Sequence, residues 1–169
     1  MLKIINDLAP FFEDCYRRIN VREYARIEGI SPPTASKLLS YYWSEKLVVP
    51  SEFRNYILFH ANKESPIFID LSRIYWREKL QPFIELMEKK SPVSSIVLFG
   101  SLAKGEAKAD SDVDIAFFGA RKEIDVSAFE KKMKRSMQVF WHGSLKEVKS
   151  PELAQSIAGG YVLKGKLVL

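Results

Sequence analysis

The sequence contains a single cysteine and no long apolar run. With Cys15 alone, the chain can form neither an intramolecular disulfide nor a zinc site built on thiolates. No stretch approaches the roughly 20 apolar residues that a membrane-spanning helix needs, and Asp7 and Pro10 come too early in the chain for a signal peptide. We therefore expect a cytoplasmic protein with no membrane partner, in which Cys15 is a small buried thiol.

A strong charge of either sign is also absent. Lys and Arg number 26 against 21 Asp and Glu, so the formal net charge of +5 is only a mild indication of a polyanionic partner such as nucleic acid or a nucleotide. Residues 1–64 hold 9 basic and 8 acidic residues, whereas residues 65–169 hold 17 and 13. Nucleic-acid binding by the first part must therefore be argued from its pattern and not from its charge.

The first part of the chain has the pattern of a small helical domain. Apolar residues at helical spacing predict a helix over residues 2–19, kinked at Pro10. A second helix is predicted to start at the N-cap Asn20 and to stop at Gly29. A third follows at once, with Ser31 as its N-cap and a proline at its first helical position. Two short helices joined by a tight turn, with an apolar helix before them, outline a helix-turn-helix.

A β-hairpin is predicted after these helices, with a short strand up to Val49, a turn at Pro50 and Ser51, and a second strand over Tyr56–Ala61. Residues 1–64 therefore resemble a winged helix-turn-helix domain, whose second motif helix enters a DNA groove. The resemblance implies DNA contacts from the helix and from the wing: Thr34, Ser36, Lys37 and Arg54. Small helical domains with a β-hairpin also serve as dimerisation or docking modules, and both interpretations stay open.

The rest of the chain is predicted to form a second domain behind a connecting helix. Residues 65–90 have helical periodicity, with a bend at Pro82. Residues 91–169 alternate between strand patterns and helix patterns, which predicts an α+β fold with a mixed sheet flanked by helices. The predicted strands are 95–99, 113–118 and 138–142, and the predicted longer helices are 126–137 and 151–159.

The stretch "IVLFGSLAKGEAKADSDVDIAFFG" places polar chemistry between two apolar strands. Gly100 and Ser101 follow the first strand directly, where backbone N–H groups and a hydroxyl can hold phosphate, and Lys104 and Ser111 lie in the same loop. Asp112 and Asp114 are two residues apart at the next strand and share a face. Two neighbouring carboxylates are tolerated when a hard cation lies between them, and Mg²⁺ bound to a nucleotide fits this description.

The same stretch resembles a known signature. Gly100-Ser101, ten intervening residues and then Asp112-x-Asp114 is similar to the motif of the DNA polymerase beta nucleotidyltransferase superfamily, in particular its minimal prokaryotic members. The resemblance implies transfer of a nucleoside monophosphate, AMP from ATP above all, to a hydroxyl group, with Mg²⁺ on the two aspartates. It also implies an acceptor such as a HEPN-type toxin or a small molecule. Some members carry a DNA-binding domain in front of the transferase domain, and because winged-helix proteins commonly form dimers, a homodimer is one expectation.

One part of the family pattern is missing. The family has a third carboxylate on the strand beside the Asp-x-Asp strand, where it completes the metal site and acts as a general base. Here that strand reads "QVFWHG" and contains no acid, which leaves His142 and Glu147 as substitutes. A second hypothesis is therefore a DNA-binding transcriptional regulator whose transferase domain senses a nucleotide. The three tryptophans, Trp43, Trp76 and Trp141, are expected in the core.

Overall fold

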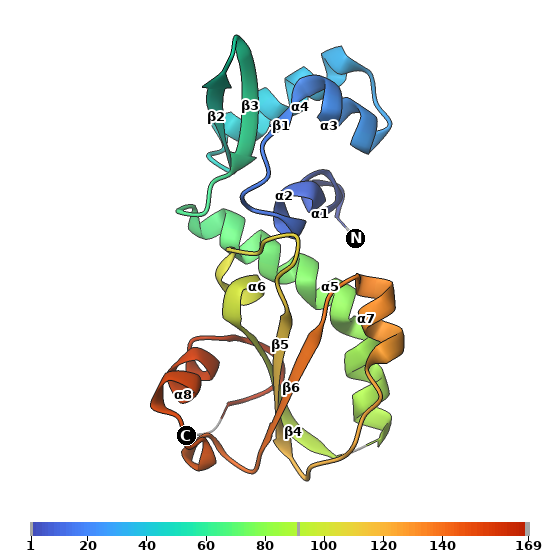
Figure 1. Cartoon of the computed structure of the whole chain (residues 1–169), viewed down its shortest axis with the longest axis vertical. Helices are drawn as coiled ribbons and strands as arrows, with labels where there is room; N and C mark the ends of the chain where they lie inside the picture. The colour runs from blue at the N-terminus through green and yellow to red at the C-terminus, as the bar shows by residue number, and fades with distance from the viewer. Residues whose placement is uncertain (1, 91, 168–169) are drawn as a thin grey trace. The chain divides into compact units, whose positions relative to one another are not determined.

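The structure is a computed structural model that describes residues 2–90 and 92–167. The chain divides into two compact units (Figure 1). We call residues 1–72 together with 105–109 the N-terminal unit, and residues 73–104 together with 110–169 the C-terminal unit. None of the helices within residues 2–90 and 92–167 combines the length and the hydropathy that a transmembrane span requires.

The N-terminal unit begins with two short helices, α1 (Lys3–Asp7) and α2 (Ala9–Glu13). The predicted single helix over residues 2–19 is therefore wrong in its length. Pro10 occupies the first turn of α2, where its missing N–H removes no hydrogen bond, so it starts a new helix after Leu8 and does not kink a continuous one. Cys15 is buried as predicted, and its backbone N–H donates to the carbonyl oxygen of Ala107.

The next two helices are α3 (Val21–Glu28), which begins and ends where the sequence predicts, and α4 (Pro32–Ser44), which begins where the sequence predicts. Asn20 caps α3 by accepting a hydrogen bond from the N–H of Glu23, and Ser31 caps α4 in the same way. Gly29 ends α3 with φ of +64°, a left-handed conformation that favours glycine.

The hairpin that follows consists of β2 (Val48–Phe53) and β3 (Tyr56–Ala61), and β1 (Ile19–Asn20) pairs with the other side of β3. Its turn lies at Arg54 and Asn55, both with positive φ, so the turn predicted at Pro50 and Ser51 is wrong. Pro50 stands opposite Phe59 inside the ladder, which β2 tolerates because it is an edge strand of this sheet. The elements of a winged helix are present in order, and that assignment stays a prediction.

The C-terminal unit is built on a mixed sheet, as predicted. It contains β4 (Val93–Phe99), β5 (Val113–Gly119), β6 (Met137–His142) and β7 (Tyr161–Gly165), in the order β6-β5-β4-β7. Only β5 and β6 run parallel. The short strand β7 was not predicted from the sequence; it pairs antiparallel with β4, on the side of β4 away from β5.

Helices cover both faces of this sheet (Figure 1). On one face lie α5 (Pro66–Lys90), which contains Pro82, and α7 (Ser127–Met133); Phe83 of α5 contacts Phe117 of β5 and Phe129 of α7. On the other face, α8 (Pro151–Ala158) and the 3-10 turn η1 (Leu145–Glu147) share a core with β4 and β5. The helix predicted over 126–137 is shorter because Lys134, with φ of +54°, ends it before β6.

The predicted burial of the tryptophans is correct for Trp76 and wrong for Trp43. Trp76 is completely buried, as expected, but Trp43 is 55% exposed, and its predicted place in the core is wrong. The buried residues of α4 are Ala35, Leu39 and Tyr42. Tyr42 returns to the side of Ala35 after seven residues, whereas Trp43 lies about 100° further round the helix.

Candidate functional site

The site predicted from the Gly-Ser and Asp-x-Asp motif forms where β4 passes into β5. Phe99, the last residue of β4, stands opposite Asp114, the second residue of β5. Gly100 follows at once with φ of +71° and begins the five-residue helix α6 (Gly100–Lys104). A Cβ atom built on Gly100 would overlap the Asp114 carboxylate, so both the backbone angle and the space require glycine.

The two aspartates are close enough to affect one another. Asp112 lies just before β5 and Asp114 inside it, and Asp114 is partly buried. Burial raises the pKa of the Asp114 carboxyl, and the negative charge of Asp112 raises it further. A cation bound beside this pair would relieve both effects, and carboxylate oxygens are the ligands that Mg²⁺ takes. Among the described residues, no group of three or more acidic, histidine or cysteine side chains is arranged to hold a metal.

The neighbouring strand supplies an amide where the family pattern has an acid. In the parallel pairing of β5 and β6, Asp114 stands opposite Gln138. The Nε2 of Gln138 donates a hydrogen bond of 2.6 Å to Oδ2 of Asp112. Because a carboxylate only accepts, the amide must present its NH₂ group here. Gln138 holds Asp112 in place but cannot take up a proton as a base would.

Neither substitute named for the missing acid reaches this place. His142 stands opposite Phe118, four residues further along β6 than Gln138, which is about 13 Å at about 3.3 Å a residue. Glu147 lies beyond His142, and its Oε2 accepts a hydrogen bond from the N–H of Gly143. The hypotheses that His142 or Glu147 assists proton transfer are therefore wrong.

A buried arginine holds the segment that leads into the Asp-x-Asp strand. Arg135 is 7% exposed, and its Nη1 donates to the carbonyl oxygen of Ser111 over 2.8 Å. Its guanidinium also lies 5.1 Å from the ring centre of Trp76. Arg135 therefore positions Ser111 and, through it, the adjoining Asp112.

Two further arginines bind the opposite end of α6 and the strand beside it. Nε of Arg73 donates to the carbonyl oxygen of Ala103 over 2.8 Å. Arg77 donates to the hydroxyl of Tyr161 over 3.0 Å and to the carbonyl oxygen of Val162 over 2.6 Å. Neither arginine was predicted from the sequence. Their spacing of four residues places them on one face of α5, but the residues that they contact lie in distant segments of the chain.

The other predicted residues are distributed over both units. Ser101 is half-buried in the first turn of α6, and Lys104 is exposed in its last turn. Ser111 offers its carbonyl oxygen to Arg135. The predicted DNA-binding residues Thr34, Ser36 and Lys37 are exposed on α4, and Arg54 is exposed at the hairpin turn.

Comparison with known protein families gives a match to the C-terminal unit. Residues 80–154 match the family model described as "Nucleotidyltransferase domain", a range that includes Gly100, Asp112, Asp114 and Gln138. Neither the curated proteins nor the solved structures give a match to the chain. The mixed sheet of β4, β5, β6 and β7 is consistent with the similarity to this family model.

Proposed function

We propose that the C-terminal unit binds a nucleoside triphosphate with Mg²⁺ and transfers its monophosphate part, AMP from ATP above all, to a hydroxyl group. The observation that supports this is the pair Asp112 and Asp114 beside Gly100, within the segment that matches the family. Asp112 and Asp114 would hold the Mg²⁺, which would neutralise negative charge on the phosphates.

The residues around this pair have separate roles. The backbone N–H groups at Gly100 and Ser101, the Ser101 hydroxyl and the Lys104 ammonium bind the phosphates, with Ser111 beside them. A bond forms between the acceptor oxygen and the α-phosphorus, the bond from the α-phosphorus to the oxygen that bridges it to the β-phosphate breaks, and pyrophosphate leaves. The proton of the acceptor hydroxyl is released as the new bond forms.

Gln138 bears on the kind of acceptor. Because the amide facing Asp112 takes no proton, the chain offers no carboxylate at that position to deprotonate the acceptor. A phenol, with a pKa of about 10, gives up its proton more easily than an alcohol does. A tyrosine of a partner protein, such as a HEPN-type toxin, is therefore a better acceptor for this site than the alcohol of a small molecule.

Gln138 also favours a second candidate function. A site that binds Mg²⁺ and nucleotide without a base turns over slowly or not at all. The C-terminal unit would then sense a nucleotide, and the N-terminal unit would bind DNA through Thr34, Ser36, Lys37 and Arg54 as a transcriptional regulator.

Labelled ATP separates the two candidates. The protein is incubated with ATP labelled in its α-phosphate, Mg²⁺ and a tyrosine-containing acceptor, beside a variant with Asp112→Ala and Asp114→Ala. Label on the acceptor with wild type alone supports transfer. DNA binding that changes with ATP, without transfer of label, supports the sensor. The same label with both proteins would contradict the assignment of the site.

A further inference from the structure

The N-terminal unit carries two adjoining hollows on its surface. The first, of about 840 Å³, lies between α3 and the hairpin turn and is lined by Arg22, Arg26 and Tyr56 among others. The second, of about 400 Å³, lies between α4 and the hairpin and is lined by Trp43 among others. Both are lined by Val21 and Ile57, so they adjoin one another, and we refer to the two hollows together as the groove.

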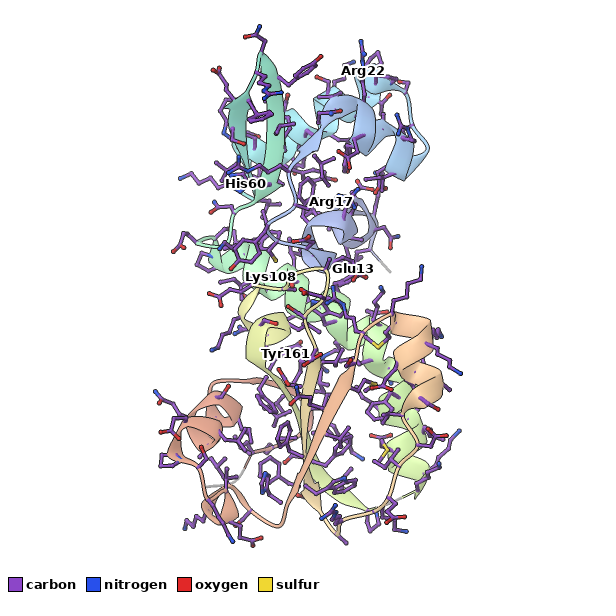
Figure 2. The ribbon with its side chains drawn as sticks, in the orientation of Figure 1. Glu13, Arg17, Arg22, His60, Lys108 and Tyr161 are labelled. Atoms are coloured by element: carbon purple, nitrogen blue, oxygen red, sulfur yellow. The ribbon has the colours of Figure 1, made fainter. Side chains whose placement is uncertain are left out.

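One end of the groove is positively charged. Arg22, which is labelled in Figure 2, and Arg26 are exposed one turn apart on α3. Within residues 2–90 and 92–167 neither forms a hydrogen bond or an ion pair. The acidic residue between them, Glu23, is paired with Arg17 over 2.6 Å. Arg54 adds a further cation at the adjoining turn. This end is therefore complementary in charge to a chain of phosphates.

Aromatic rings stand exposed along the same groove. Trp43 is 55% exposed and Tyr56 is 65% exposed. Trp43 reaches the groove from α4 together with Ser36 and Ser40, which leave room beside it. Rings of this size are normally buried, and exposed ones beside cations are typical of surfaces on which nucleic-acid bases stack.

We propose that this groove binds single-stranded nucleic acid, with its phosphates on Arg22 and Arg26 and its bases against Trp43 and Tyr56. In a duplex the faces of the bases are covered by their neighbours, so free ring faces on the protein contribute little to duplex binding. Unpaired bases have free faces, and each of them can be stabilised by stacking on an aromatic side chain. The groove belongs to the N-terminal unit, so nucleic-acid binding there does not require nucleotidyl transfer. The inference rests on the DNA-binding proposal and restricts it to single-stranded nucleic acid.

Fluorescence anisotropy tests this with the full chain and a labelled oligothymidylate of about a dozen nucleotides, within the usual size of such sites. Trp43→Leu keeps an apolar side chain but removes the ring, and it is expected to weaken binding about tenfold. Trp43→Phe keeps a ring and is expected to bind within about threefold of wild type. Because Trp43 is exposed, thermal unfolding of both variants should match wild type.

The charged end is tested with Arg22→Ala plus Arg26→Ala. The double variant should bind more weakly, and its slope of log affinity against log salt should be about 1.4 shallower, since each lost phosphate contact removes about 0.7 for a single strand. Lys131→Ala plus Lys132→Ala removes the same charge from α7 of the C-terminal unit and should leave the binding of the oligonucleotide unchanged.

Three results would overturn the proposal. A duplex of equal length could bind as tightly as the single strand, or Trp43→Leu and Trp43→Phe could lose the same affinity for the oligonucleotide. The third is displacement of the oligonucleotide by an equally long polyglutamate. Calorimetry with Mg²⁺ and ATP on the same preparations separates this outcome from failure of the transferase site. Heat from ATP without binding of the oligonucleotide would contradict the groove alone.

Discussion

At the scale of single residues, Gln138 decides what the candidate site can do. It lies opposite Asp114 and donates to Asp112, so it stabilises the arrangement of the carboxylates while offering no base. An acid at this place would remove the hydrogen bond to Asp112 and add a group that accepts a proton. Under the proposed function, the side chain at position 138 is therefore expected to decide between transfer and sensing.

The first prediction is that Gln138→Asp increases the rate of AMP transfer to a tyrosine acceptor by about 100-fold, the lower end of what a positioned base contributes. The rate should then rise with pH through the pKa of the new carboxyl. Single-turnover measurements with labelled ATP check this. Gln138→Met, which fills similar space without a proton acceptor, is the control, and an equal gain with Met would contradict a base at this position.

Gly100 gives a second prediction, because its neighbour Asp114 leaves no room for a Cβ. Gly100→Ala should lower the free energy of unfolding by about 1–3 kcal/mol and weaken ATP binding. Gly29→Ala is a matched control, since Gly29 has a similar φ of +64° but no atom within 4 Å of the added Cβ. Urea unfolding should show a smaller loss at Gly29, and equal losses would mean that the contact with Asp114 is unimportant.

A third prediction concerns the pKa of Asp114, which burial and Asp112 raise above its ordinary value. The folded state then holds the proton to higher pH than the unfolded chain, whose value is about 3.9, so stability falls as pH rises through this window. Asp114→Asn removes the effect. Urea unfolding in the presence of a chelator measures this. The free energy of unfolding of the variant should exceed that of wild type by more at about pH 7 than at about pH 4. An equal difference at both pH values would contradict the raised pKa.

At the scale of elements, the local chemistry of helix ends and strands could be predicted from the sequence. Asn20, Gly29 and Ser31 act where their types predict, because caps depend on near neighbours in the chain. The register that puts Gln138 opposite Asp114 could not be predicted, because it depends on how separate strands pair. The exposed Trp43 was missed because three consecutive aromatic residues, Tyr41, Tyr42 and Trp43, lie near the end of α4, and only Tyr42 is buried.

The segment between α7 and β6 supplies a prediction at this scale. Arg135, in that segment, donates to Ser111 ahead of β5, and the N–H of Val113 donates to the carbonyl oxygen of Ser136. Arg135→Lys keeps the charge but loses the planar guanidinium against Trp76. We expect a loss of about 1–3 kcal/mol in the free energy of unfolding and weaker ATP binding.

Urea unfolding and ATP titration of the Arg135→Lys variant check this expectation. Lys132→Arg, an exposed change on α7, is the control and should match wild type. If Arg135→Lys equals wild type in both measurements, Arg135 has no positioning role.

At the scale of the whole molecule, the motif contributes to both compact units. Residues 105–109, between Ser101 and Asp112, belong to the N-terminal unit. In that unit Ala107 is completely buried and accepts a hydrogen bond from Cys15, and Lys108 lies over the ring of Tyr16. The motif alone did not reveal this, because its polar loop has the composition of a solvated turn.

Ala107→Asp tests that placement. The buried carboxylate should destabilise the N-terminal unit, and hydrogen exchange should show faster exchange in α2 and at Cys15 than in wild type. Ala109→Asp, an exposed change two residues away, is the control. Unchanged exchange in α2 with the Ala107 variant would place the loop outside the N-terminal unit.

The central claim is that Asp112 and Asp114 hold Mg²⁺ with a nucleoside triphosphate, and titration calorimetry with ATP tests it most directly. The wild type is predicted to give binding heat with ATP when Mg²⁺ is present and much less in chelator, and the variant with Asp112→Ala and Asp114→Ala is predicted to give none. No heat from wild type at millimolar ATP and Mg²⁺, or the same heat from the double variant, would contradict the account.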